Sequence, residues 1–154
     1  MHVVYLAIVG DMLTSLLFDL TDSEDHFPGR SRETRLEEIW NIYDDWCGRS
    51  SIPDKISRRL FSTTFLKAGK YLDIPQKVMS AASARYAIFF MATLMRLVLS
   101  SGAAETPELL WMAGVCWAME TMERLMINAG PRDFFSKWFI SECEQTDSIC
   151  CSCV

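Results

Sequence analysis

One long apolar run constrains the fold of this chain more than any other feature. Of the fourteen residues from Tyr86 to Leu99, only Thr93 and Arg96 are polar, and no glycine or proline interrupts them. A helix that is apolar on every side belongs in the centre of a helical bundle or in a membrane. Because crossing a bilayer takes about 20 apolar residues, the run predicts a central core helix, entered through a polar hinge at 82–85.

A second apolar run follows after a short connection. Residues 109–119 are eleven consecutive apolar residues, and the connecting residues 100–107 contain the serines, glycine and proline of a turn. Two helices joined by so short a link are expected to lie antiparallel. The two runs therefore predict a hydrophobic helical hairpin, with Leu109–Trp117 among the most buried segments and amphipathic helices around it.

The spacing of apolar residues predicts the elements that precede the hairpin. We expect a helix over residues 2–20, then an acidic loop over 21–30 that closes with Pro-Gly. Ser31 is a favourable N-cap for a second helix, which should end at the glycine of Cys47-Gly48. These signals predict two amphipathic helices joined by a polar loop.

Further helices are expected on both sides of the hairpin. A segment over 51–69 has apolar residues at helical spacing, and Pro75 can open the long helix that reaches Leu99. Asn-Ala-Gly-Pro at 128–131 predicts a helix stop, and a short amphipathic helix should follow from Asp133. The chain then enters a polar segment.

The expected fold class is all-α, with seven or eight helices. No internal repeat is visible, and no stretch alternates as a strand would for more than a few residues. We expect one helical domain over residues 1–140 and a flexible, cysteine-rich tail over 141–154. The tail thiols belong to Cys143, Cys150, Cys151 and Cys153.

Charge and cysteine placement limit the function classes. The net charge is −5 and the fifteen Lys and Arg residues are scattered, which argues against a nucleic-acid-binding face. The N-terminal segment has no secretory pattern, so we expect a reducing compartment, free thiols and no transmembrane anchor. Cys47 and Cys116 should be small buried residues. For the tail thiols, lipidation of Cys151 or its neighbours is the alternative to a plain disordered segment.

Catalytic and metal-binding patterns are weak. Asp44-Asp45 lies on a helix as magnesium-binding pairs do, but the positions three and four further on are Cys47 and Gly48. The tail cysteines do not form paired C-x-x-C units, and the two histidines are far from them in sequence. There is no glycine-rich phosphate loop. We expect no enzyme activity, no metal and no cofactor.

Two segments resemble homology motifs of the Bcl-2 apoptosis regulators. Residues 83–90, Ser-Ala-Arg-Tyr-Ala-Ile-Phe-Phe, resemble the first motif, in which Asn-Trp-Gly-Arg precedes aliphatic residues and Phe-Phe. Residues 127–135, Ile-Asn-Ala-Gly-Pro-Arg-Asp-Phe-Phe, resemble the second, in which Gly-Gly-Trp precedes Asp and a helix with Phe. Their order, and their separation by one apolar helix, agree with that family. The resemblance covers roughly Leu36 to Phe139.

The chain also departs from the family pattern. Asn-Trp-Gly of the first motif is Ala-Ser-Ala at 82–84, and Gly-Gly-Trp of the second is Gly-Pro-Arg at 130–132. The helix at 36–45 matches the third motif only loosely. Such divergence in a short chain resembles viral members of the family, which implies a location in the host cytoplasm with recruitment to mitochondria.

The resemblance implies a binding function. Pro-survival members inhibit apoptosis by sequestering pro-apoptotic Bcl-2-homology-3 helices, such as those of Bim, Bak or Bax, in a hydrophobic surface groove. Arg85 would pair with the aspartate of the ligand, because a guanidinium takes a carboxylate with two hydrogen bonds. The expected groove residues are Trp40, Tyr43, Phe61, Phe65, Ala82, Ala84, Arg85, Ile88 and Phe89.

Two alternatives remain beside this hypothesis. The chain could be an unrelated all-α adaptor or scaffold whose hairpin is only core, and most methionines and aromatic residues would then be core filler. A homodimer could also form through the groove, since an exposed apolar surface can be covered by a second copy. An enzyme is the third and weakest hypothesis.

Overall fold

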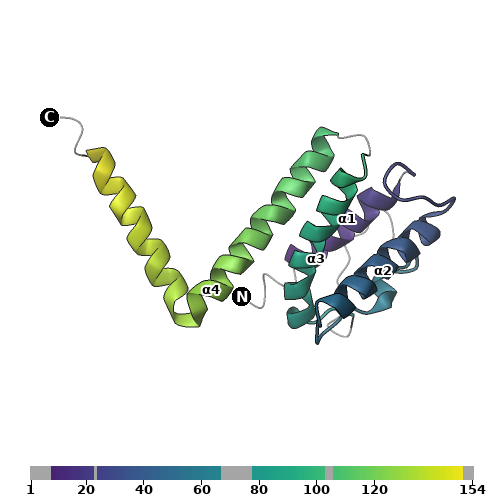
Figure 1. Cartoon of the computed structure of the whole chain (residues 1–154), viewed down its shortest axis with the longest axis horizontal. Coiled ribbons are helices and arrows are strands. Elements are labelled where there is room, and N and C mark those ends of the chain that lie inside the picture. The colour runs from purple at the N-terminus through teal and green to yellow at the C-terminus, as the bar shows by residue number, and fades with distance from the viewer. Residues whose placement is uncertain (1–7, 23, 67–77, 103–105, 151–154) are drawn as a thin grey trace. The chain divides into compact units, whose positions relative to one another are not determined.

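The computed structural model describes residues 8–22, 24–66, 78–102 and 106–150, with side chains described up to residue 129. No strand occurs among these described residues, so the all-α prediction is confirmed. The expectation of seven or eight helices in a Bcl-2-like bundle stays a prediction. In chain order (Figure 1), the elements are α1 (Gly10–Asp22), α2 (Arg32–Arg49), the short 3-10 helix η2 (Arg58–Phe61), α3 (Ala81–Ser100) and α4 (Pro107–Cys150).

The chain forms two compact units, Met1–Trp117 and Ala118–Val154. Within the first unit, α1 packs on α2 and on α3, and η2 packs on α2. Helix α4 begins in the first unit and makes up the described part of the second. The predicted single domain over residues 1–140 stays a prediction.

Helices α1 and α2 follow the sequence closely. Leucines at positions 13, 16, 17 and 20 are buried at helical spacing along α1, so the predicted amphipathic helix is confirmed over its described part. Residues 1–7 of that prediction lie outside the described residues. The side chain of Ser31 caps α2 by accepting a hydrogen bond of 3.2 Å from the backbone N–H of Thr34, as predicted.

Helix α3 carries the centre of the core. Phe90, Met91 and Met95 are among its fully buried side chains, which confirms the prediction of a core helix. The helix begins later than Pro75, because Ser80 caps it by accepting a 3.0 Å hydrogen bond from the backbone N–H of Ser83. Residues 78–80 are not helical, and residues 75–77 lie outside the described part.

One side of α3 faces outward, which the prediction of a helix buried on every side missed. Its exposed residues recur at the spacing of a single helix face. The face begins with one exposed residue, continues with three half-buried residues, and ends with three exposed residues. We call this face the α3 outer face; it consists of Ala82, Arg85, Tyr86, Phe89, Thr93, Arg96 and Leu97.

The segment 51–69 is not the helix that its apolar spacing predicted. Only Arg58–Phe61 forms a short 3-10 turn, and residues 67–69 lie outside the described part. The backbone N–H of Ile56 donates to the hydroxyl of Tyr43 at 2.8 Å, and that of Ser57 donates to the carbonyl of Val78 at 2.9 Å. In a helix that opens at 51–53, these two N–H groups would bond to the carbonyls four residues before them. Because both bond to partners from other segments, the predicted helix cannot run through 56 and 57.

Helix α4 differs from the sequence prediction in two ways. In Leu109–Trp117, only Leu109, Ala113 and Cys116 are buried, so the segment has one buried side and is not among the most buried stretches. The helix also continues through 128–131 and on to Cys150, although a helix stop was predicted at 128–131. The flexible tail over 141–154 stays a prediction. Pro131 lacks the backbone N–H that a helix would use at this position, but the chain is helical on both sides of Pro131.

Candidate functional site

A cluster of aromatic side chains joins α2, η2 and α3. We call it the aromatic cluster; its members are Trp40, Tyr43, Trp46, Phe61 and Phe90. Its centre is Tyr43, whose ring lies 4.8 Å from that of Phe90 in an edge-on arrangement and 5.4 Å from that of Phe61 in a stacked one. Such ring pairs stabilise beyond simple burial. The cluster therefore fixes α2 relative to η2 and α3.

The hydroxyl of Tyr43 extends this contact to the loop before η2. It accepts the hydrogen bond from Ile56, and the Tyr43 side chain is completely buried. Burial raises the pKa of Tyr43, because the phenolate would lose its hydration there. The hydroxyl thus stays neutral and acts as a structural acceptor.

Polar pairs tie the same loop to the exposed side of α2. Arg58 donates to both carboxylate oxygens of Glu37 at 2.5 and 2.6 Å, and Lys55 donates to Asp44 at 2.8 Å. The hydroxyl of Thr63 also bonds to Glu33. As the residue number rises along α2, the partner's number falls, so the loop runs antiparallel to the helix. The pairing with Asp44 raises the pKa of Lys55.

The pair Asp44-Asp45 is engaged with basic side chains. Asp44 bonds to Lys55, and Asp45 bonds to Arg49 one turn further along α2 at 2.6 Å. Within the part of the chain that the structure describes, no three His, Cys, Asp or Glu side chains gather as a metal site would require. The arrangement gives these aspartates a structural role in holding the loop and the end of α2.

The predicted groove residues fall into two layers. One layer is buried, and it consists of Tyr43, Phe61, Ala84 and Ile88. The other is half-buried or exposed, and it consists of Trp40, Phe65, Ala82, Arg85 and Phe89. The aromatic contacts bring Trp40, Tyr43 and Phe61 together directly.

The residues of the second layer come from all three elements around the aromatic cluster. Trp40 lies on α2, Phe65 follows η2, and the other members lie on the α3 outer face. Arg85 and Phe89 are four residues apart, so they are neighbours on that face. This face therefore places a half-buried arginine and a half-buried phenylalanine in succession along α3.

Sequence reasoning missed two aromatic residues in this region. Trp46 is half-buried, and its ring stacks 6.2 Å from that of Tyr43. Tyr86 is half-buried on the α3 outer face beside Arg85. Both could have been found from helical spacing, since Trp46 is three residues after Tyr43 and Tyr86 is three residues before Phe89.

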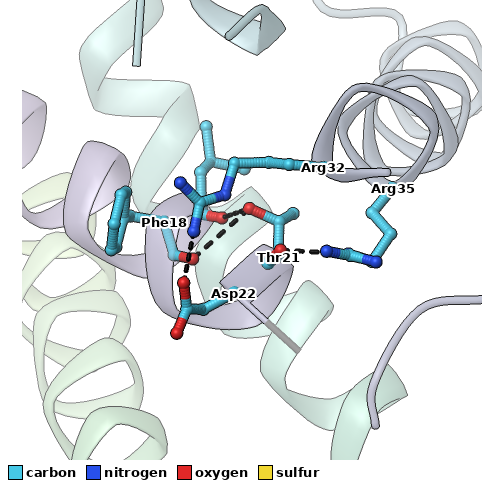
Figure 2. A network of polar contacts seen from close by, with 6 residues as sticks. Phe18, Thr21, Asp22, Arg32 and Arg35 are labelled. Atoms are coloured by element: carbon cyan, nitrogen blue, oxygen red, sulfur yellow. Dashed lines mark hydrogen bonds and ion pairs between the residues drawn. The ribbon is translucent and has the colours of Figure 1, made fainter. Parts of the chain in front are cut away.

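A second polar network holds the acidic loop between α1 and α2 (Figure 2). The Arg35 side chain is almost completely buried, and its Nε donates to the carbonyl of Thr21 at 3.0 Å while an Nη donates to that of Gly29 at 2.5 Å. Arg32 pairs with Asp22 and lies over the ring of Phe18, 4.1 Å from its centroid. Both guanidinium groups are used in closing the loop.

Gly29 is required by this loop closure. Its φ of 153° lies in a region that side chains disfavour, and a Cβ there would lie 3.1 Å from the Cβ of Thr34. The glycine therefore lets the loop backbone approach α2 closely enough for its carbonyl to reach Arg35. This arrangement explains why the Pro-Gly pair closes the loop.

The two described cysteines of the helices are buried and free, as predicted. Burial raises the pKa of the Cys116 thiol to about 11 and also raises that of Cys47. A thiol that is kept protonated is a poor nucleophile. The side chains of the four tail cysteines lie outside the described part.

Among the described residues, one helix is long and apolar enough to cross a membrane: α3, with about half of its most apolar window buried in the protein. The core helix of a water-soluble bundle passes the same test, and α3 has that position here.

Comparison with known proteins finds no relative of this chain. No family model matches the chain, and no curated protein or solved structure matches it.

Proposed function

We propose that this protein inhibits apoptosis by sequestering the amphipathic Bcl-2-homology-3 helices of pro-apoptotic proteins in the host cytoplasm. The ligand would lie on the region where α2, η2 and the α3 outer face meet. The observation that carries the proposal is that Trp40, Phe65, Arg85 and Phe89 are half-buried on the segments that the aromatic cluster joins. Under this proposal the three aromatic side chains supply apolar contacts to the ligand, and Arg85 supplies a cation.

The chemistry of this layer suits an amphipathic helix with an acidic residue. Aromatic side chains that are partly exposed above a rigid, buried base can take up apolar anchors with little loss of rotamer freedom. The guanidinium of Arg85 at the start of α3 would receive the aspartate of the ligand with paired hydrogen bonds. The rest of the ligand helix would remain in contact with solvent.

The second candidate is a helical adaptor or scaffold without a groove ligand. The observation in its favour is that Tyr43, Phe61, Ala84 and Ile88 are completely or almost completely buried. Under this hypothesis the aromatic cluster stabilises the fold, and partner proteins use other surfaces. The two candidates differ in whether an isolated Bcl-2-homology-3 peptide binds.

A fluorescence anisotropy titration separates the two candidates. Labelled peptides of the Bim, Bak and Bax type would be titrated with the full chain. For each peptide, a control peptide would carry alanine in place of the aspartate that is proposed to pair with Arg85. Saturable binding that weakens with the alanine peptide supports sequestration. Equal signals for both peptides, or none at protein concentrations of about 100 µM, a range in which even weak specific complexes form, would favour the adaptor.

A further inference from the structure

The first part of α4 has an apolar side that faces solvent. Its buried residues, Leu109, Ala113 and Cys116, recur at helical spacing and define the inner side. On the other side, Trp111 is 77% exposed, Leu110 48% and Val115 46%. All residues from 109 to 119 are uncharged, whereas the solvent side of an ordinary surface helix is charged or polar.

Gly114 lies in the middle of this exposed side. A Cβ added there would meet no atom within 4 Å, so nothing in the chain itself requires a glycine at this position. Glycine inside a helix costs stability relative to alanine. A glycine flanked by Leu110, Trp111 and Val115 leaves a shallow depression between large apolar side chains, where a second helix can approach closely.

We propose that this side of α4 is a dimer interface, occupied by the same side of α4 in a second copy of the chain. With the two helices antiparallel and crossing at Gly114, a two-fold axis brings the two glycines together. Trp111 of each copy then lies beside Val115 of the other. The surface is self-complementary in the way that a two-fold interface requires, because the large Trp111 of each copy meets the smaller Val115 of the other.

The exposed area fits a second copy. From their exposed fractions, Trp111, Leu110 and Val115 together offer roughly 300–400 Å² of apolar surface. A standard interface buries about 800 Å² on each partner, of which a little over half is apolar. The surface therefore provides the apolar core of a small interface, and we expect a dissociation constant of the order of 10 µM. An uncharged face also meets an identical one without repulsion.

Sedimentation velocity of the full chain tests the dimer. The protein would be measured from about 1 to 300 µM, a range that brackets the expected constant, with a reductant so that the tail thiols cannot link copies. The wild-type chain should pass from monomer to dimer over this range. Gly114→Leu should raise the dissociation constant at least tenfold, because the added side chain prevents close approach, and Trp111→Glu should do the same.

Two further measurements make the result specific. Gly114→Leu should raise the thermal midpoint of the dilute monomer, since it removes a helix glycine where there is room for a side chain. Leu97→Glu is the matched control, because Leu97 is 45% exposed on α3 and should leave the dissociation constant unchanged. A wild-type chain that is monomeric throughout, or a dimer that both α4 variants leave intact, would overturn the proposal. A monomer that binds neutral phosphatidylcholine vesicles through Trp111 would overturn it in favour of a lipid surface.

Discussion

The hydroxyl of Tyr43 accepts a 2.8 Å hydrogen bond from the backbone N–H of Ile56, across thirteen residues of chain. This one contact places the loop before η2 on α2, and the ring of the same tyrosine places α2 on Phe90 of α3. A single buried side chain thus organises the three elements that would carry the ligand. Both the stability of the fold and the shape of the proposed site depend on it.

Removal of this hydroxyl should destabilise the protein. In Tyr43→Phe the ring contacts remain, but the buried N–H of Ile56 is left without its acceptor, which typically costs about 1–3 kcal/mol. Urea denaturation followed by tryptophan fluorescence measures the loss. Tyr86→Phe is the control, because Tyr86 is half-buried on the α3 outer face, and its stability should stay within about 0.5 kcal/mol of wild type. Equal stability of all three proteins would mean that the hydrogen bond contributes nothing.

Two adjacent phenylalanines of α3 should behave differently. Phe90 is completely buried in the aromatic cluster, so Phe90→Ala should cost about 3–5 kcal/mol of unfolding free energy. Phe89 is half-buried on the outer face, so Phe89→Ala should cost much less stability but weaken a bound peptide. Denaturation curves and peptide titrations of both variants check this division. A larger stability loss for Phe89→Ala would contradict the assignment of the two faces.

How far the sequence predicts this fold is visible in α2 and α3. Apolar spacing and the Ser31 cap were sufficient for α2, because both are local signals. The burial of Phe90 and its neighbours followed from an uninterrupted apolar run. Thr93 and Arg96, the two polar residues of that run, lie on the α3 outer face, so the sequence contains a signal for which side is exposed. The partial exposure of Tyr86, Phe89 and Leu97 on the same face could not be predicted, since it depends on which other elements pack against the helix.

The failures arose where distant contacts decide local structure. The segment at 51–69 has helical apolar spacing, but Ile56 and Ser57 donate their hydrogen bonds to Tyr43 and Val78. Periodicity contains no information about such partners. For the candidate site, the sequence indicated Trp40, Arg85 and Phe89 through a family resemblance, while the layering of buried and half-buried residues became visible only in the structure.

The two arginines that hold the α1–α2 loop, Arg35 and Arg32, should contribute differently to stability. Arg35→Met should cost about 2–4 kcal/mol, because it removes two hydrogen bonds from a buried cation to the carbonyls of Thr21 and Gly29. Arg32→Met should cost about 1 kcal/mol or less, since its partner Asp22 is exposed. Denaturation measures both. Limited proteolysis should also show faster cleavage of the loop in Arg35→Met alone, and identical cleavage in both variants would contradict this ranking.

Arg85 is the sharpest test of the proposed ligand site. Arg85→Ala should weaken a Bcl-2-homology-3 peptide by about 2–5 kcal/mol, because the aspartate of the ligand would be left partly desolvated without its partner. Arg85→Lys should recover only part of this, since a single ammonium does not reproduce two parallel hydrogen bonds. Anisotropy titrations measure the affinities. Arg49→Ala is the control, because Arg49 is exposed at the end of α2 and pairs with Asp45. Unchanged affinity in both Arg85 variants would exclude Arg85 from the site.

The raised pKa of Cys116 predicts how the free energy of unfolding changes at alkaline pH. Its pKa is raised to about 11 in the folded protein, whereas an unfolded thiol ionises near its ordinary value of about 8.5–9. Between these values the unfolded chain has lost the proton and the folded chain has kept it, so the free energy of unfolding must fall as pH rises. The stability from this group is therefore complete below about pH 8.5 and is lost toward pH 11, by about 2–3 kcal/mol.

A variant isolates this contribution from that of other buried groups. Cys116→Ala should lower stability at neutral pH through the smaller side chain, but its stability should decline less than that of wild type between pH 9 and 11. Tyr43 remains in both proteins, and its own raised pKa contributes equally to each decline. Urea denaturation at closely spaced pH values under reducing conditions gives the two curves. If they run parallel, the Cys116 thiol does not titrate differently in the folded and unfolded chains, and its burial in solution is less complete than in the structure.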